Sequence, residues 1–167
     1  MFEREFTTAL AAPEDQPMTA LRAFETLVQK TVGAKLLTLT TVEPATGEAA
    51  RIFSNMPKHY PVAGRKPADE TDWSRQVLRD RKNFVANTIE DIAAVFPDHE
   101  LIRSLGCESV VNVPVEVAGE VIGTINLLHE AAYYTPERVA QADRLRLSAA
   151  MCFMLCQHLK YLDVPHV

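Results

Sequence analysis

The segment from Ser109 to His129 constrains the fold of this chain more than any other. It holds two runs of β-forming residues, 110–115 and 121–128, with Ala118 and Gly119 between them. Two such runs joined by a short turn that contains glycine predict a hairpin of antiparallel strands. The chain therefore has an antiparallel sheet on which its other segments pack.

Residues 18–32 and 135–162 predict the first and last helices of the domain. Apolar side chains recur at helical spacing in residues 18–32, with Thr19 as the expected N-cap and Gly33 as the expected end. In the last helix Thr135 is a suitable N-cap, and a proline follows it at the first helical position. We expect one continuous helix there.

Between these helices, composition predicts a second hairpin and a long irregular stretch. Residues 36–42 and 49–54 are rich in β-forming residues and flank a turn. Residues 55–71 hold three prolines and a glycine, and a loop of this length is commonly functional. The segments that follow are expected to be a short helix (72–80), a short strand (83–87) and two short helices broken at Pro97 (89–105).

This order of elements predicts an α+β fold with a mainly antiparallel central β-sheet of five to six strands, because hairpins outnumber crossover connections. The 167 residues are enough for one domain. We expect that domain to span residues 18–162. Residues 1–17 are expected to be a loose N-terminal arm, and residues 163–167 a short C-terminal tail.

Charge and hydropathy exclude several classes of protein. The 17 basic and 22 acidic residues give a net charge of −5, and the sequence lacks the basic stripe of a nucleic-acid binder. No apolar run reaches the roughly 18 residues that span a bilayer, and the acidic N-terminus does not resemble a secretory signal. Three cysteines, an odd number, favour free thiols in a reducing compartment. We therefore expect a cytoplasmic protein that binds neither nucleic acid nor membrane.

Three segments together resemble the most recognisable block of the GAF domain family. Residues 109–115 are a strand with a proline near its end, residues 119–128 are its partner after a glycine turn, and residues 134–137 open the last helix. The resemblance covers residues 18–162. It implies a GAF/PAS-like architecture, with the N- and C-terminal helices on one sheet face and loops and short helices that roof a small-molecule pocket on the other.

The period-two alternation of a strand indicates which sheet face carries this pocket. Asn112, Thr124 and Asn126 share one face of the hairpin, and apolar side chains fill the other. We expect the apolar face under the terminal helices and the mixed face under the roof. A buried polar group without a partner costs about 1–3 kcal/mol. The partners are therefore either a ligand, or water and the backbone of the roof.

Four further side chains complete the predicted ligand-binding set: Tyr60, Arg65, Trp73 and Phe84. Tyr60 and Trp73 flank the long loop, where they act either as an aromatic lid or as plain packing. Arg65 is suited to a carboxylate or other anion, and a solvated pair with Lys66 is the alternative.

The resemblance implies a stand-alone sensory or regulatory module that binds a small cytosolic molecule. GAF domains usually regulate an attached output domain, and these 167 residues contain none, so we expect a separate effector protein to carry the output. No Cys or His pair has the spacing of a zinc site, so no metal and no cofactor beyond an unidentified small-molecule ligand is expected.

An enzyme is the alternative reading, because free methionine-(R)-sulfoxide reductases are stand-alone GAF domains that use cysteines. Their catalytic and resolving cysteines lie in the segment that corresponds to residues 54–106, which contains no cysteine here. Cys107 stands nearby without a partner, so this activity is disfavoured and no catalytic residue is assigned. An unassigned conversion of a metabolite, using Arg65, His99 or Asn112, is the remaining enzymatic alternative.

The last helix also predicts self-association. Residues 149–156 contain no charged residue for two turns, whereas one face of this helix is enough to cover the sheet. Exposed apolar surface commonly marks a protein contact, and symmetric dimers are the commonest soluble oligomers. We expect a homodimer through the first and last helices. The alternative is that the leading helix covers this surface within the monomer.

Overall fold

Six strands form one antiparallel sheet in the order β3-β2-β1-β6-β5-β4. The computed structural model describes residues 2–166. The strands are β1 (Leu36–Val42), β2 (Ala49–Ser54), β3 (Arg65–Lys66), β4 (Phe84–Ala86), β5 (Ser109–Val117) and β6 (Glu120–His129). Both predicted hairpins, β1–β2 and β5–β6, are present, and β6 pairs with β1 to join them. The predicted α+β fold class is confirmed.

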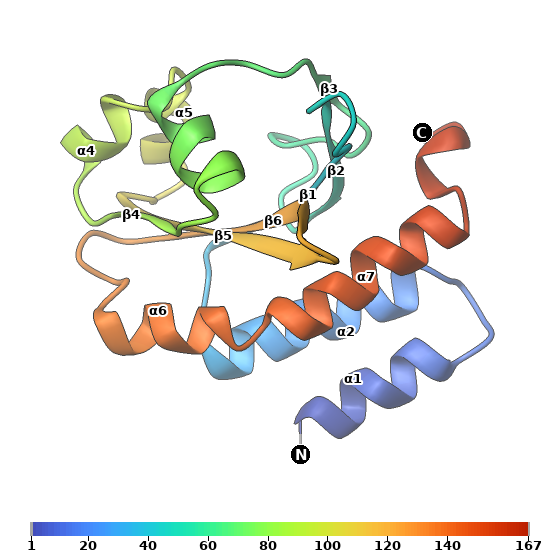
Figure 1. The fold of residues 1–167 in the computed structure, drawn as a ribbon. Helices are drawn as coiled ribbons and strands as arrows, with labels where there is room; N and C mark the ends of the chain where they lie inside the picture. Colours follow the sequence, from blue (N-terminus) through green and yellow to red (C-terminus); the bar gives the residue numbers. More distant parts are fainter. Residues whose placement is uncertain (1, 167) are drawn as a thin grey trace.

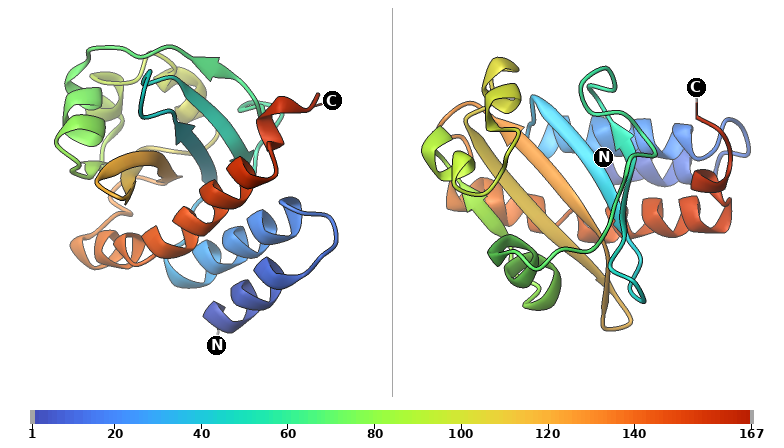
Figure 2. Two further views of the ribbon diagram at one scale, coloured as in Figure 1. Left: turned by 45° about the vertical axis from the view of Figure 1, so that its right-hand side comes forward. Right: turned by 90° about the horizontal axis from the view of Figure 1, so that it is seen from above.

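Two layers of helices cover the sheet (Figures 1 and 2). The terminal helices α1 (Phe2–Ala11), α2 (Met18–Thr31), α6 (Pro136–Asp143) and α7 (Arg146–His158) lie on one face. The other face carries α3 (Asp72–Ser74), the π-helical turn η1 (Arg75–Arg79), α4 (Ile89–Ala93) and α5 (His99–Ser104). We call these short helices and their connecting loops the roof, and the sheet face beneath them the roof face. A final 3₁₀ turn, η2 (Tyr161–Asp163), follows α7.

The predicted alternation along the β5–β6 hairpin is confirmed. Its apolar side chains lie in the core with the terminal helices and are almost fully buried: Val111, Val113, Ile125 and Leu127. Phe24 of α2 and Phe153 of α7 belong to the same core. The polar side chains of the hairpin consequently point to the roof face.

Gly123 marks a close approach of α7 to the sheet. A Cβ at this position would overlap the ring of Phe153, which is itself buried. We expect Gly123→Ala to lower the free energy of unfolding, measured in urea, by about 1–3 kcal/mol, because the ring or the strand must shift. The same substitution should cost less in a Phe153→Leu background. Equal costs in the two backgrounds would contradict the overlap.

The N-terminal residues correct one prediction, because most of the expected loose arm at residues 1–17 is the helix α1. Phe2, Phe6 and Leu10 recur every four residues and face the core of the terminal helices. The ring of Phe6 lies 6.3 Å from that of Phe24, in an edge-to-face arrangement. This packing on α2 supplies the stability that a ten-residue helix lacks in isolation.

The start of α2 also differs from the prediction. Pro17, not Thr19, occupies the N-cap position, and no side chain caps the helix. Thr19 lies inside the first turn, and its hydroxyl donates to the carbonyl of Glu14 at 3.0 Å. At the other end, Gly33 has a φ of +92° just after the helix, as expected of a glycine that ends it.

The expected continuous helix over residues 135–162 is two helices, α6 and α7. Thr135 caps the first, as predicted, by accepting a bond from the Arg138 backbone at 3.4 Å. At the break, Arg146 donates to Asp143 and to Asn83, which lies just before β4. These bonds favour a break between α6 and α7, although the sequence has no proline or glycine there that would predict one. Within residues 2–166 no helix combines the length and apolarity needed to cross a membrane.

Candidate functional site

A row of hydrogen-bonded polar side chains crosses the roof face of the sheet. The indole Nε1 of Trp73 donates to Oδ1 of Asn112 at 2.9 Å, and Nδ2 of Asn112 donates to Oδ1 of Asn126 at 2.8 Å. Nδ2 of Asn126 in turn lies within bonding distance of the hydroxyls of Thr38, at 3.2 Å, and Thr40, at 3.3 Å. We call these five residues the amide ladder. It links α3, β5, β6 and β1 through side chains alone.

The register of the sheet explains why these residues meet. Asn112 lies opposite Asn126 across β5 and β6, and Asn126 lies opposite Thr38 across β6 and β1. Directly opposed side chains on one face are close enough to bond. Thr124 lies two residues from Asn126 on the same face and is buried. The structure therefore brings the three polar side chains predicted from alternation to one surface.

Aromatic rings lie beside the ladder. The ring of Phe96 is 6.4 Å from that of Trp73 and 5.9 Å from that of Phe84, in edge-to-face pairs. Phe84 is the β4 residue opposite Asn112. Trp73 and Phe84, both predicted site residues, are thus brought together by Phe96, which the sequence reasoning missed.

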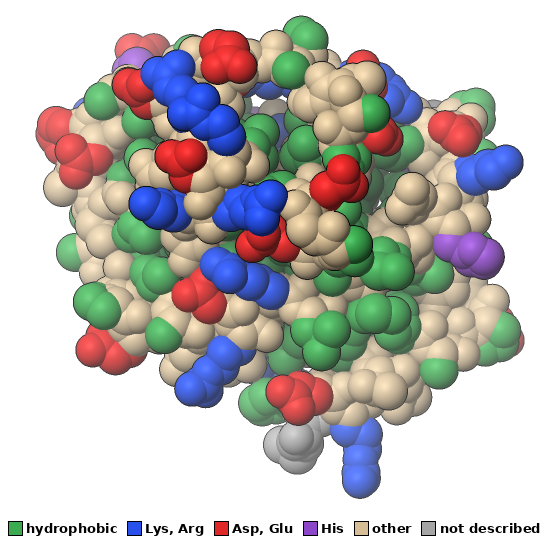
Figure 3. Space-filling view, viewed as in Figure 1, with side chains coloured by type: hydrophobic (Ala, Val, Ile, Leu, Met, Phe, Trp, Pro, Cys, Tyr) green, Lys and Arg blue, Asp and Glu red, His purple; other side chains and the backbone are tan. Residues whose placement is uncertain are grey.

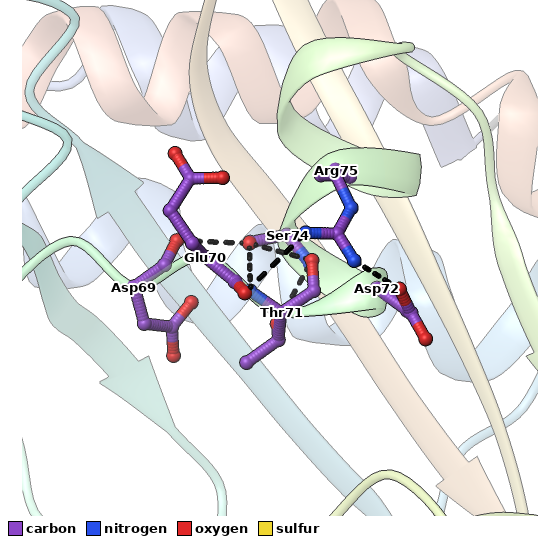
Figure 4. Close-up of polar contacts among 6 residues, drawn as sticks. All are labelled: Asp69, Glu70, Thr71, Asp72, Ser74 and Arg75. Atoms are coloured by element: carbon purple, nitrogen blue, oxygen red, sulfur yellow. Dashed lines mark hydrogen bonds and ion pairs between the residues drawn. The ribbon is translucent and has the colours of Figure 1, made fainter.

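A capping box fixes the short helix that carries Trp73 (Figure 4). The hydroxyl of Thr71 accepts the backbone N–H of Ser74 at 3.0 Å, and the hydroxyl of Ser74 accepts that of Thr71 at 2.9 Å. The ion pair of Asp72 with Arg75 adds a contact on the outer side of the same turn. The indole is therefore held over the sheet by local bonds as well as by Asn112.

Tyr60, in the loop between β2 and β3, and Asp98, in the roof, form a second polar contact. The phenol of Tyr60 donates to Oδ2 of Asp98 at 2.6 Å. Burial first, and then the hydrogen bond to Asp98, raise the pKa of the phenol well above its usual range, so Tyr60 is protonated at neutral pH. The guanidinium carbon of Arg51, on β2, lies 5.2 Å from the centre of the Tyr60 ring.

Residues 15–152 match the sequence family described as the GAF domain. The chain belongs to the GAF domain family. This confirms the resemblance carried by residues 109–137. Comparison with curated protein sequences found no match.

Solved GAF domains share the fold at low sequence identity. The GAF domain of a phosphoenolpyruvate-protein phosphotransferase from Coxiella burnetii has a TM-score of 0.67 and 17% identity, covering 96% of this chain and 93% of its own. The phycoerythrobilin-bound GAF domain of a cyanobacterial phytochrome also has a TM-score of 0.67, with 13% identity and 96% of both chains covered. A GAF domain/HD domain protein from Geobacter sulfurreducens has a TM-score of 0.63 and 15% identity, covering 84% and 92%. At these identities the neighbours show that the chain has the GAF fold.

Arg65 lies apart from the other predicted site residues of this GAF domain. It sits on β3, at one edge of the sheet, and its guanidinium pairs with Glu48 at 2.6 Å. It lines a groove of about 610 Å³ that the turn after β1 forms with the C-terminal end of α7. The basic side chain on the roof face is instead Arg51, which the sequence reasoning did not single out.

All three cysteines of the GAF domain are free and buried. Burial raises the pKa of the Cys107 thiol, although Lys35 opposes this shift. Burial also raises the pKa of Cys152, and it raises that of Cys156 to about 12. A raised pKa makes the nucleophilic thiolate scarce at neutral pH, so these thiols are poorly suited to redox catalysis.

The buried thiols predict a loss of stability in alkali. The folded chain keeps the Cys156 proton up to pH about 12, whereas an unfolded thiol loses it near pH 8.5. Above that pH the unfolded state binds fewer protons, so the free energy of unfolding should fall by about 1.4 kcal/mol per pH unit for each such thiol. Urea unfolding between pH 8 and 10.5 measures the slope. Cys156→Ala should flatten it, and an unchanged slope would contradict this account.

Proposed function

We propose that this GAF domain is a cytosolic sensory module that binds a small molecule between the amide ladder and the roof. The amide ladder is the observation that carries the proposal. Asn112 and Asn126 each use one amide oxygen and at least one N–H within the ladder, so their orientation is fixed before any ligand arrives. Fixed donors and acceptors lower the cost of binding.

The aromatic side chains support the same site. Trp73, Phe84 and Phe96 offer ring faces and edges to an apolar or planar ligand, next to the polar groups that would fix its orientation. Ligand sites commonly combine such surfaces with a few placed polar groups. One structural neighbour is a GAF domain that holds phycoerythrobilin. The buried thiols favour binding over the thiol-based catalysis of the enzymatic alternative.

Native mass spectrometry of freshly purified protein tests this proposal. We expect a retained small molecule that is released on denaturation, and that raises the melting temperature when it is added back without being consumed. Asn126→Ala should weaken its binding by roughly 1–3 kcal/mol if the amide bonds the ligand. Ligand turnover would favour the enzymatic alternative, and binding unaffected by Asn112→Ala and Asn126→Ala would place recognition elsewhere.

The proposal includes a homodimer that passes the signal to a separate effector protein. Leu147, Met151 and Met154 recur at helical spacing on α7 and are 75%, 37% and 46% exposed. Figure 3 shows hydrophobic side chains gathered over this helix. Helix α1 packs on α2 and so leaves the α7 stripe open, which centres the proposed contact on the last helix. A second copy of the chain suits this stripe, because the stripe carries no charge that would be repelled by the same charge in a symmetric contact.

A further inference from the structure

Arg51 occupies the roof face next to the amide ladder. It lies opposite Thr40 of the ladder across β1 and β2, and directly opposed residues point to the same face. The loop that leads from β2 to β3 runs beside it, because the backbone of Arg51 bonds to Ala63 and Gly64, and Tyr60 of that loop lies over the guanidinium. Its side chain therefore lies, partly buried, between the sheet and Tyr60.

The guanidinium of Arg51 is only partly satisfied. One N–H donates to the carbonyl of Pro61 at 2.9 Å. Its Nε is buried and finds no acceptor among the residues that the structure describes. A guanidinium offers five N–H donors in a planar fork, so a single carbonyl leaves most of this capacity unused.

Arg51 also lacks a directly bonded counterion. Within residues 2–166 it forms no direct ion pair, because the carboxylate of Asp98, whose charge acts on Arg51, accepts the phenol of Tyr60 instead. Burial lowers the pKa of Arg51, although Tyr60 and Asp98 oppose the shift. A half-buried cation without a directly bonded anion is a costly arrangement, and holding one loop carbonyl does not require it, because a neutral amide donor would do the same.

We propose that the ligand of the roof site carries an oxyanion, such as a carboxylate, phosphate or sulfonate, that Arg51 binds. Arginine matches the two oxygens of such groups with parallel N–H donors. The anion supplies the missing charge, the ladder binds the polar edge of the ligand, and the rings cover its apolar part. This inference rests on the proposed function and adds the chemical class of the ligand.

A pair of fluorescent probes tests it: 1-anilinonaphthalene-8-sulfonate, which is anionic, and N-phenyl-1-naphthylamine, which has the same rings without the sulfonate. Trp73 is the only tryptophan of the chain, so energy transfer from it reports probe binding to the domain, and the Arg51 and Arg65 variants locate the site. We expect Arg51→Gln to weaken the sulfonate probe about tenfold or more, as loss of a charge-assisted bond does. The neutral probe should change less than twofold.

Two further variants control the experiment. Arg65→Gln removes an arginine outside the roof site and should change neither affinity. Arg51→Lys keeps the charge and should retain much of the preference for the sulfonate probe. This variant also provides the test if Arg51→Gln does not fold. Equal weakening of both probes, or sulfonate binding unchanged by Arg51→Gln, would overturn the oxyanion inference and leave the roof site intact. Failure of both probes to bind the natural sequence would overturn the proposed function as well.

Discussion

We expect Asn112→Leu to lower the free energy of unfolding by about 2–4 kcal/mol. Leucine has nearly the same size but neither bonds Trp73 nor donates to Asn126, so two polar groups lose their partners. Each such loss costs about 1–3 kcal/mol when the group is buried, and Asn112 is only 3% exposed. Urea unfolding followed by circular dichroism measures the change.

A double-mutant cycle separates this effect from simple repacking. Asn126→Leu alone leaves Nδ2 of Asn112 without its acceptor, whereas the double variant removes both amides together. Apolar replacement of both partners is much less costly than replacement of one. The double variant should therefore be more stable than the sum of the single losses predicts, by about 1 kcal/mol or more. Strict additivity would show that the ladder bonds contribute little.

The ladder illustrates how much of this site the sequence contains. The alternation of polar and apolar residues in β5 and β6 assigns Asn112, Thr124 and Asn126 to one face, because side chains on a strand alternate with period two. It also separates that face from the core residues beneath α2 and α7. The GAF resemblance then indicates that the roof lies over this face.

The hydrogen-bond partners of these side chains could not be predicted from the sequence in the same way. Trp73 is 39 residues from Asn112, and Tyr60 is 38 residues from Asp98. Such contacts depend on how the roof loops close over the sheet, which no local pattern encodes. Arg51 was missed for a related reason. An irregularity in the pairing of β1 with β2, between Leu39 and Thr40, sets which residues of β2 face the roof.

The predictions at the two ends of the chain show the limits of local signals. The break between α6 and α7 depends on Asn83, far away in sequence, which bonds Asp143 and Arg146. The helix α1 carries a clear apolar repeat, yet its stability comes from packing Phe6 on α2. Propensity and periodicity predict a helix, whereas tertiary contacts determine whether it is stable and where it ends.

Met154→Glu should convert the proposed homodimer to a monomer. Met154 lies in the exposed stripe of α7 together with Leu147 and Met151. Its neighbour Phe153 is buried in the core. In a symmetric pair both copies would bring a carboxylate into an apolar contact, where an unpaired charge is strongly unfavourable. We expect the dissociation constant to rise by at least about 100-fold.

Sedimentation equilibrium at micromolar concentration measures this result. The natural sequence should sediment at twice the 18.6 kDa of the single chain, and Met154→Glu at 18.6 kDa. Gln141→Glu adds the same charge to an exposed position of α6, outside the stripe, and should leave the dimer intact. Because Met154 is outside the core, the variant should keep its circular dichroism spectrum.

A natural sequence at 18.6 kDa throughout would refute the dimer, and a dimeric Met154→Glu would move the interface away from α7. An unfolded variant would instead show that the stripe packs within the chain, which the exposed position of Met154 argues against.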